Sequence, residues 1–482
     1  MTTLTCKLPH PNDLTDTGEI VRLFLSECQL APVKRLPQLR LDVAGKKQQW
    51  VATATINGIG EGRFACPRRP DAMVDKRMRR RAAKMALYLA FRQHYPAPAW
   101  GALTGVRPTK LAYTLLDECP DMAHVLAELE QTWQVGPDKI ALMERILATQ
   151  QGWRVPPTQA AGEYDVYIGI PFCPTRCSYC SFCSLPLTSK YRTLVEPYLE
   201  ALKLEMRLSA PLMWGKRLRS LYIGGGTPTI LTPDQLLDLL RFAQRLFGTP
   251  IETTVEAGRP DTITQGHVDV FRAMQVDRVS VNPQSTDPDT LARIGRGHTV
   301  DQLYQAYDMC RVLPTINMDI IAGLPGEDFD AYAKTLADCL AMAPENLTVH
   351  TLALKRSSAL WGAQQPTQQP EMVQAMLQHT YDTVLAQGYD PYYLYRQKYM
   401  TANLENVGFC RNGRVGRYNI DNMEETHTVL AFGAGAITKR IAYPEYIITR
   451  AVNLRDVGQY LARLEEQVAR KQSLFFEELP IG

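Results

Sequence analysis

The sequence lacks long apolar runs, and it lacks an apolar stretch near its first residues. No run approaches the roughly 18 apolar residues that a membrane-spanning helix needs. Residues 1–7 contain Thr, Cys and Lys and do not form the apolar core of a secretory signal peptide. We therefore expect no membrane span and no export, and we predict a cytoplasmic protein.

The sequence also lacks a strong charge imbalance and an even set of cysteines. Its 53 basic and 50 acidic residues leave a net charge of only +3, so composition alone does not indicate a nucleic-acid partner. Eleven cysteines, an odd number, argue against a disulfide framework in a chain without an export signal. A length of 482 residues suggests two or three domains.

Three of the cysteines form one compact motif. Cys173, Cys177 and Cys180 follow the spacing Cys-x3-Cys-x2-Cys, and soft thiolates suit iron–sulfur clusters and zinc. A closed zinc site takes four ligands, whereas a cubane held by three thiolates leaves one iron open to a small molecule. We therefore predict a [4Fe–4S] cluster on these three cysteines, with S-adenosylmethionine at the open iron. The alternative is a zinc site completed by Cys183 or a distant His, and the role of Cys183 stays open between ligand, shielded neighbour and packing.

Around this motif the sequence resembles the radical S-adenosylmethionine superfamily. Within it, the chain is similar to the oxygen-independent coproporphyrinogen III oxidase group, and there most of all to the HemZ-type coproporphyrinogen dehydrogenases. The resemblance covers most of the chain from about residue 100 onward. One departure is Gly169, which stands where the better-known oxidases have His. The resemblance rests on residues 170–177, on Gly-Gly-Gly-Thr-Pro at 224–228, on 317–327, and on the HemZ-like stretches 103–110 and 391–396.

The resemblance implies a binding site for S-adenosylmethionine, with a second such site left open. It places Arg296 at the carboxylate of the cofactor, where a guanidinium pairs well, and Gln284 and Asp319 at the ribose hydroxyls. Tyr167 and Cys183 are the catalytic candidates. The alternative for the buried acids and amides is a structural role, with their polar atoms bonded to backbone. The residues matched to cofactor binding are Tyr167, Tyr179, Gly225, Gly226, Thr227, Glu256, Gln284, Arg296 and Asp319.

The resemblance also implies a function in haem and porphyrin biosynthesis. The expected reaction is the oxygen-independent oxidative decarboxylation of coproporphyrinogen III propionates to vinyl groups, giving protoporphyrinogen IX, by a 5′-deoxyadenosyl radical. The expected partners are the tetrapyrrole substrate and a flavodoxin- or ferredoxin-like electron donor. Two alternatives stay open: a haem-binding chaperone of the same family, and a radical methyltransferase or haem-opening enzyme that acts on a tetrapyrrole.

A tetrapyrrole needs cations for its propionates and aromatic surface for its macrocycle. Arg356 and Arg396 are the candidates for the propionates, and the aromatic residues of 391–396 lie near Arg396 in the sequence. The alternative is an amphipathic strand whose basic side chains reach out to solvent.

Strand-like and helix-like runs alternate from residue 164 to residue 351. Six such units predict a parallel sheet and an α/β fold, a partial (β/α)6 TIM-like radical SAM barrel. The reactive groups should gather at the carboxyl ends of the strands, where the cysteines and the glycine-rich turn fall. The expected strands lie near 164–170, 220–225, 252–256, 277–282, 315–321 and 346–351, and the helices near 194–209, 232–246, 264–275, 300–312 and 328–341.

Two further segments flank the predicted barrel. We divide the chain into an N-terminal α+β module at 1–155, the barrel at 160–355, and a C-terminal α+β extension at 356–482 that covers the substrate. The extension contains a predicted helix at 371–386 and an aromatic-rich stretch at 389–399.

The N-terminal module combines strands with a basic helix. Strands are expected near 39–43 and 50–56, and the helix from about Asp75 carries several Arg and Lys residues. This order has a faint likeness to a double-stranded-RNA-binding domain. A basic helix face is more often solvated or packed on acidic residues, so nucleic acid is not an expected partner.

Overall fold

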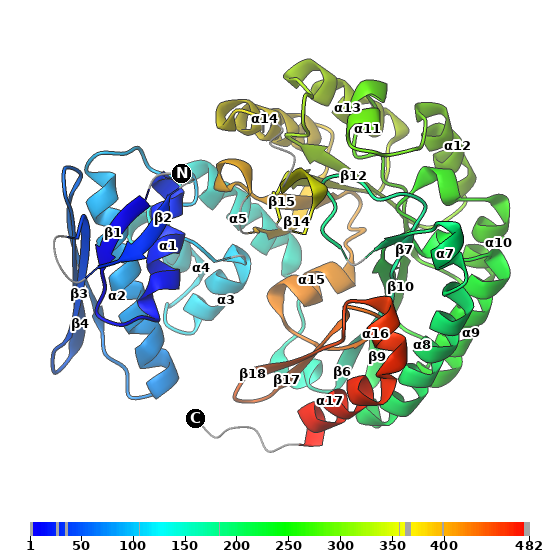
Figure 1. The fold of residues 1–482 in the computed structure, drawn as a ribbon, viewed down its shortest axis with the longest axis horizontal. Helices are drawn as coiled ribbons and strands as arrows, with labels where there is room; N and C mark the ends of the chain where they lie inside the picture. Colours follow the sequence, from blue (N-terminus) through cyan, green and yellow to red (C-terminus); the bar gives the residue numbers. More distant parts are fainter. Residues whose placement is uncertain are drawn as a thin grey trace. The chain divides into compact units, whose positions relative to one another are not determined.

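The computed structural model describes most of the chain. Its contacts divide the chain into two compact units, one up to Glu144 and one from Arg145 onward, and each is described by itself (Figure 1). Two of the predicted site residues, Cys183 and Arg356, lie outside the described residues. The described residues are 3–25, 28–33, 37–105, 107–182, 184–355, 357–361, 368–397 and 400–476.

The first unit is a five-stranded sheet with helices. The strand order is β2-β1-β3-β4-β5, in which β3, β4 and β5 form antiparallel pairs and β1 runs parallel to β2 and β3. The strands predicted near 39–43 and 50–56 correspond to β3 and β4. The elements are β1 (Thr3–Lys7), α1 (Asp13–Phe24), β2 (Gln29–Pro32), β3 (Leu39–Gly45), β4 (Gln49–Ile56), β5 (Gly60–Pro67), α2 (Ala72–Arg92), α3 (Pro108–Leu116), α4 (Met122–Gln131) and α5 (Pro137–Gln150), which crosses the boundary between the units.

The basic helix of this unit packs on an acidic one. Helix α2 begins three residues before the predicted Asp75. Arg79 forms a bidentate ion pair with Asp13 of α1 at 2.8 and 2.9 Å, and Arg80 forms one with Asp16 at 2.5 and 2.6 Å. Both carboxylates are buried, and these two arginines are held by α1. For Arg79 and Arg80 the packed alternative holds, whereas Lys76 and Arg77 of the same helix are exposed.

The second unit contains a curved sheet with seven consecutive parallel strands, of which six form its core. These six correspond to the six predicted strands, and the predicted α/β partial barrel is confirmed. The sheet has eleven strands in the order β14-β15-β13-β12-β11-β10-β9-β6-β16-β17-β18. The parallel strands of the predicted barrel are β6 (Glu163–Ile170), β9 (Arg217–Gly225), β10 (Glu252–Val255), β11 (Arg278–Ser280), β12 (Ile316–Ala322) and β13 (Asn346–Thr351).

Helices follow these strands and line the outer side of the sheet (Figure 1). Helix α9 begins as its sequence indicates, because Thr232 and Gln235 form a capping box and Pro233 occupies the first turn. The helices are α8 (Val195–Ser209), α9 (Pro233–Phe247), α10 (Gln265–Ala273), α12 (Val300–Cys310) and α13 (Phe329–Met342), with the short α6 (Pro157–Ala160), α7 (Ser189–Arg192) and α11 (Pro288–Arg293) and the two-residue strands β7 (Phe172–Cys173) and β8 (Leu185–Pro186).

The residues after β13 add strands to both edges of the parallel core. On one side, β15 pairs antiparallel with β13 and β14. On the other side, β16 pairs in parallel with β6, and β17 and β18 continue the sheet as antiparallel strands. The elements are α14 (Pro370–Ala386), β14 (Asp390–Tyr395), β15 (Asn406–Cys410), α15 (Arg417–Glu424), β16 (Thr428–Phe432), β17 (Ile437–Ala442), β18 (Ile447–Val452), α16 (Val457–Ala462) and α17 (Leu464–Phe476).

None of the helices in the described ranges combines the length and the apolar character that crossing a bilayer requires.

Candidate functional site

A cavity lies at the carboxyl ends of the parallel strands in the second unit. It contains most of the predicted site residues, although they are spread over nearly 150 positions of sequence. Among the described residues, Tyr167 and Arg396 are not part of its wall. The predicted residues that line it are Cys173, Cys177, Tyr179, Cys180, Gly225, Gly226, Thr227, Glu256, Gln284, Arg296 and Asp319.

The three cysteines of the motif lie together on the loop that follows β6. Cys173 ends β7, and the Thr227 hydroxyl donates a hydrogen bond to its sulfur at 3.4 Å. Cys177 is buried. Burial raises the pKa of the Cys173 and Cys180 thiols above the ordinary value. A soft metal or cluster binds the thiolate form, so loading this site must release protons.

The glycine-rich turn after β9 lies directly against the cysteine loop. The Gly226 amide donates to the Ile170 carbonyl at 2.7 Å. A Cβ atom on Gly226 would lie 2.5 Å from the Phe172 carbonyl oxygen and 3.0 Å from the Cys173 sulfur. Gly225 has φ +105°, a conformation that side chains disfavour. The turn therefore requires glycine in order to bring backbone close to the cysteines.

Arg296 is buried beside the cysteine motif. Its Nη1 lies 4.0 Å from the Cys177 sulfur and 3.2 Å from the Tyr179 hydroxyl. Its Nη2 donates to the carbonyl oxygens of Gly258, at 2.6 Å, and Asn282. Its Nε is buried without a hydrogen-bond partner in the part of the chain that the structure describes. The guanidinium is thus fixed by backbone and keeps one donor without a partner among the described residues.

A second guanidinium reaches the same sulfur and was not predicted from sequence. The Nη1 of Arg259 lies 4.0 Å from the Cys177 sulfur and 3.0 Å from the Thr175 hydroxyl. Asp261 holds Arg259 through two hydrogen bonds of 2.9 and 2.8 Å. No motif marks Arg259, and the signal in the sequence is its place just after the end of β10.

Asp319 is the centre of a polar network on β12. Its carboxylate accepts hydrogen bonds from the side-chain amides of Asn282 at 2.8 Å and Asn317 at 2.7 Å. His350 Nε2 lies 3.5 Å from the same carboxylate, and the Tyr395 hydroxyl contacts His350 Nδ1 at 3.2 Å. His350 and Tyr395 therefore extend the predicted site, and both line the cavity.

Two amide oxygens in the cavity wall have no hydrogen-bond donor. Gln284 has φ +67°, and its backbone N–H donates to the backbone carbonyl of Asp319 at 2.9 Å, which anchors this loop to β12. Gln284 Oε1 and Asn282 Oδ1 are buried and unpartnered among the described residues. Because buried polar atoms are normally paired, these oxygens indicate a polar ligand with hydroxyl or amino donors.

Glu256 follows β10 and lies under the glycine-rich turn. The Tyr222 hydroxyl donates to Glu256 Oε1, and the Gly225 amide contacts Glu256 Oε2 at 3.4 Å. Burial raises the pKa of the Glu256 carboxyl to about 7, and the nearby Asp319 charge adds to this effect. Glu256 can thus hold a proton near neutral pH.

Tyr167 and Arg396 lie outside the cavity wall. Tyr167 stacks with Tyr222 at a ring distance of 6.1 Å and with Tyr418 of α15 at 6.3 Å, inside the curved sheet. Arg396 is buried and donates to the Asn403 carbonyl at 2.8 Å. Burial lowers the pKa of Arg396 to about 10. Their predicted roles in catalysis and propionate binding stay predictions.

A different cation faces the cavity. Lys355 lines it next to the cysteine motif, and burial lowers the pKa of its ammonium while the field of Cys180 opposes that effect. Lys355 forms no ion pair within the described residues. An unpaired, half-buried ammonium is a natural contact for an anionic ligand group.

The donor set fits an iron–sulfur cluster with an attached polar cofactor. Cys173, Cys177 and Cys180 supply three soft ligands on one loop. The glycine turn leaves room for a ligand to approach the backbone closely. The side-chain oxygens of Gln284 and Asn282, which have no partner among the described residues, can accept hydrogen bonds from that ligand. A small molecule that carries amino, hydroxyl and carboxylate groups would provide hydrogen-bond partners for the polar atoms that line this cavity.

Comparison with known proteins adds independent findings. Residues 167–339 match the model of the Radical SAM superfamily. Over 472 residues the chain is 34% identical to the oxygen-independent coproporphyrinogen-III oxidase-like protein HemZ of Bacillus subtilis (strain 168), covering 94% of this chain and 93% of that protein.

Two further relatives are more distant. The chain is 26% identical over 309 residues to the haem chaperone HemW of Bacillus subtilis (strain 168), covering 63% of this chain and 76% of that protein. The structure of the coproporphyrinogen III oxidase HemN of Escherichia coli, a radical SAM enzyme, matches with a TM-score of 0.52 at 22% identity, covering 65% of this chain and 72% of that one. This last likeness is one of fold.

Proposed function

The chain belongs to the family of HemZ-type, oxygen-independent coproporphyrinogen-III oxidase-like proteins in the radical S-adenosylmethionine superfamily, and from this we propose its reaction. The proposed reaction is the oxidative decarboxylation of coproporphyrinogen III propionates to vinyl groups, giving protoporphyrinogen IX in the cytoplasm. One observation carries the proposal: the cysteine motif, the glycine-rich turn, the Asp319 network and the unpaired Lys355 face one cavity.

The cluster would be held by three side chains and left open at one iron. Cys173, Cys177 and Cys180 are the proposed ligands, and a flavodoxin- or ferredoxin-like protein is the proposed electron donor. When bound, the cluster and S-adenosylmethionine supply a 5′-deoxyadenosyl radical that can take a hydrogen atom from a propionate side chain.

The cavity wall offers a separate contact for each part of S-adenosylmethionine. We place its amino group at the backbone of Gly225 and Gly226 and its carboxylate at Arg296, whose Nε is buried without a hydrogen-bond partner among the described residues. Gln284 offers an unpartnered oxygen to the ribose hydroxyls, and Asp319 is held in place for the same purpose by Asn282. Burial of these groups excludes water and strengthens each contact.

The substrate end of the cavity is proposed around Lys355 and the His350–Tyr395 pair. Lys355 would bind a propionate carboxylate, and Tyr395 would offer an aromatic face to the macrocycle. His350 is held between the Tyr395 hydroxyl and the Asp319 carboxylate, so it can keep a proton near the substrate. Arg356 and Arg396 remain proposed propionate contacts.

The cluster is tested first, because every later step depends on it. Anaerobic reconstitution should give about four irons per chain, as a cubane requires. Cys173→Ala, Cys177→Ala and Cys180→Ala should each remove the broad visible absorption, and Cys339→Ala, at a buried cysteine away from the motif, should retain it. Tightly bound zinc without iron after anaerobic purification would contradict the cluster.

The reaction is tested by product analysis. Reconstituted protein with coproporphyrinogen III, reductant and S-adenosylmethionine should couple 5′-deoxyadenosine and methionine formation to loss of carbon dioxide. Lys355→Gln should lower vinyl-group formation at least tenfold while uncoupled cleavage of S-adenosylmethionine persists, because the cation is proposed to contact only the substrate. A cleavage-competent enzyme that leaves the propionates intact would refute the proposed reaction.

The similarity to HemW favours one rival, a haem-binding chaperone. Stoichiometric haem binding without decarboxylated product would support that rival. A methylated or ring-opened tetrapyrrole would instead indicate another radical reaction on the same cavity.

A further inference from the structure

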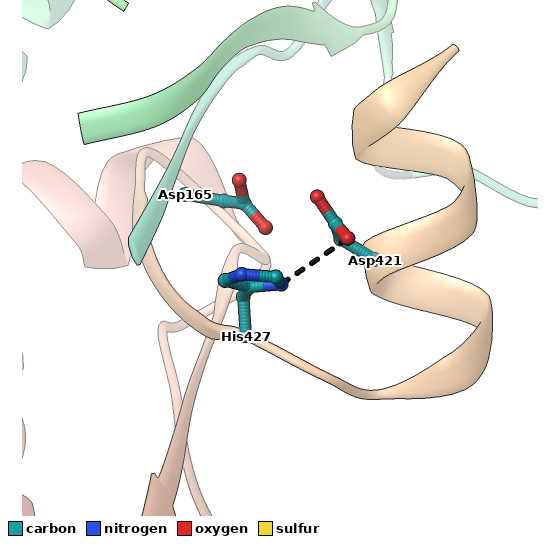
Figure 2. Close-up of side chains that lie close together, drawn as sticks. All are labelled: Asp165, Asp421 and His427. Carbon is teal, nitrogen blue, oxygen red and sulfur yellow. Dashed lines mark ion pairs between the residues drawn. The ribbon is translucent and has the colours of Figure 1, made fainter. Parts of the chain in front are cut away.

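A second group of chemistry-bearing side chains lies inside the second unit, apart from the cavity. Asp165 comes from β6, Asp421 from α15, and His427 from the segment just before β16, and Figure 2 shows the three side chains turned toward one another. A ligand atom from each lies within 4.8 Å of the others. All three residues are fully buried, at 0% exposure. We call them the Asp165–Asp421–His427 triad.

The triad has two buried atoms without hydrogen-bond partners. Asp165 Oδ1 accepts from the Ser220 hydroxyl at 2.5 Å, but Asp165 Oδ2 is unpartnered among the described residues. His427 Nδ1 lies 3.2 Å from Asp421 Oδ1 and 2.9 Å from the Thr426 hydroxyl, whereas His427 Nε2 makes no hydrogen bond in the same sense and lies 3.6 Å from Glu163 Oε2. Both orphaned atoms belong to groups that ligate metals.

The hydrogen bond on one ring nitrogen prepares the other as a ligand. Nδ1 lies 3.2 Å from Asp421 Oδ1, and Nε2 lies 3.6 Å from Glu163 Oε2, so one nitrogen can keep the proton while the other offers its lone pair. Metal-binding histidines are held in this way by a carboxylate on the far nitrogen. The free Asp165 oxygen supplies a second donor atom. A carboxylate oxygen of Asp421 completes the group of atoms that lie within 4.8 Å of one another.

The charges around the triad leave a deficit of positive charge. Within the part of the chain that the structure describes, three neighbouring buried carboxylates, Glu163, Asp165 and Asp421, face one buried guanidinium, Arg219, and the imidazole of His427. Arg219 bonds to Asp421 at 2.6 Å and to Glu163 at 3.2 Å, and Arg217 reaches Glu163 from an exposed position. Buried carboxylates persist when they are paired or bind cations.

We propose that Asp165, Asp421 and His427 bind a divalent first-row transition-metal ion, of the Zn²⁺ or Mn²⁺ class. One imidazole nitrogen with carboxylate oxygens suits these borderline ions better than Ca²⁺, which takes six to eight oxygens. The ligands are completely buried, so the proposed ion would not contact a substrate.

The proposed ion would join three separate parts of the second unit. Asp165 lies opposite Val429 in the parallel pairing of β6 and β16, and α15 also carries Tyr418, which stacks on Tyr222 at 4.4 Å. The ion would therefore hold α15 and β16 against the first barrel strand. Removal of the ion should lower the stability of this region.

The main competitor for the site is a single proton. Burial, together with the neighbouring Asp421 charge, raises the pKa of Asp165 to about 7. A protonated Asp165 could donate to His427 Nε2 and satisfy both orphaned atoms without any metal. Metal binding and protonation make opposite predictions for added Zn²⁺, so one experiment separates them.

The experiment uses the full chain with the cysteine motif disabled. In the triple variant Cys173→Ala, Cys177→Ala and Cys180→Ala, added Zn²⁺ or Mn²⁺ cannot bind the thiolates of the motif. Equilibrium dialysis followed by elemental analysis should find one bound ion per chain. Asp165→Asn or His427→Gln in that background should weaken binding at least tenfold. Glu205→Gln changes an equally buried carboxylate that is paired with Lys471, and it should keep the ion.

Folding is monitored alongside binding, because the variants remove buried groups. Far-UV circular dichroism and thermal unfolding show whether each variant is folded, and Zn²⁺ should raise the Tm of the triple variant but not that of its Asp165→Asn derivative. Co²⁺ added to the triple variant should give visible d–d bands of an N/O site. The absence of a stoichiometric ion and of the Co²⁺ bands, or equal binding by the triad variants, would overturn the proposal and assign the position to a proton.

Discussion

At the scale of single residues, two guanidiniums at Cys177 set the electrostatics of the predicted cluster. The Nη1 atoms of Arg259 and Arg296 each lie 4.0 Å from its sulfur. Hydrogen bonds and positive charge near cluster sulfurs favour the reduced, more negative state. Arg259 is the better probe, because Arg296 also faces the proposed cofactor.

Arg259→Gln should shift the reduction potential of the reconstituted cluster to more negative values. A shift of about 59 mV corresponds to a tenfold change in the ratio of reduced to oxidised cluster. An EPR-monitored redox titration measures the potential, and Arg272→Gln on α10 serves as the control. An unchanged potential in a variant with full iron content would show that Arg259 has no influence on the cluster.

The raised pKa of Glu256 makes the unfolding free energy of the protein depend on pH. Its folded-state pKa of about 7 is raised by burial above the ordinary value of 4.5. The folded protein therefore holds this proton longer than the unfolded chain, and its contribution to stability is lost as pH rises from about 4.5 to about 7.

Glu256→Gln should remove this loss. At pH 8, relative to pH 5, the variant should gain on the order of 2–3 kcal/mol of unfolding free energy over the wild type, at 1.36 kcal/mol per pKa unit. Urea unfolding of both cluster-free proteins at the two pH values measures the difference. Parallel pH profiles of the two proteins would contradict a raised pKa for this carboxyl.

At the scale of elements, local pattern was sufficient for the barrel strands but not for the sheet edges. The six strands near 164–351 could be predicted because apolar runs alternate with amphipathic helices and turns. The segment Thr428–Phe432 is an equally good strand in sequence. Its parallel pairing with β6, more than 250 residues earlier, could not be predicted, because hydrophobic period does not specify a distant partner or a register.

The pairing of α1 with α2 explains the basic helix of the first unit and can be tested. Asp13→Asn with Asp16→Asn removes both acidic partners of Arg79 and Arg80. Because Arg79 and Arg80 each lose a bidentate ion pair with a buried carboxylate, we expect a loss of about 2–4 kcal/mol in unfolding free energy. Urea unfolding at 50 and 500 mM salt measures it. Arg40→Gln, which breaks an exposed pair with Asp42, is the control and should have little effect.

The same pair of helices bears on RNA binding. With Arg79 and Arg80 held by α1, the wild type should bind structured RNA only weakly. A tight, strongly salt-dependent complex in fluorescence anisotropy would contradict this expectation and revive the alternative of an RNA-binding module.

At the scale of the whole molecule, the site was predictable to the extent that it follows from motifs and strand ends. The cysteines, the glycine turn and Asp319 carry family motifs, and the structure brings them to one cavity. Arg259 and the Asp165–Asp421–His427 triad carry no motif. They form through packing between segments far apart in the chain, so the sequence alone did not reveal them.

The division into two units predicts a division of labour. All the described residues that line the cavity belong to the second unit. Deletion of residues 1–136 keeps α5 (Pro137–Gln150) whole, and with it Gln150, whose side chain bonds to the Tyr392 carbonyl at 2.9 Å. The truncated protein should therefore cleave S-adenosylmethionine within about twofold of the full chain, because each cofactor contact is retained.

Anaerobic assay of 5′-deoxyadenosine with dithionite as the reductant measures this cleavage. Iron content and circular dichroism must first show that the truncated protein is folded and loaded. Propionate decarboxylation is measured in parallel, since a loss confined to that step would place the first unit in substrate handling. Complete loss of cleavage in a folded, iron-loaded truncation would mean that the second unit cannot bind or activate its cofactor alone, and the division of labour would be wrong.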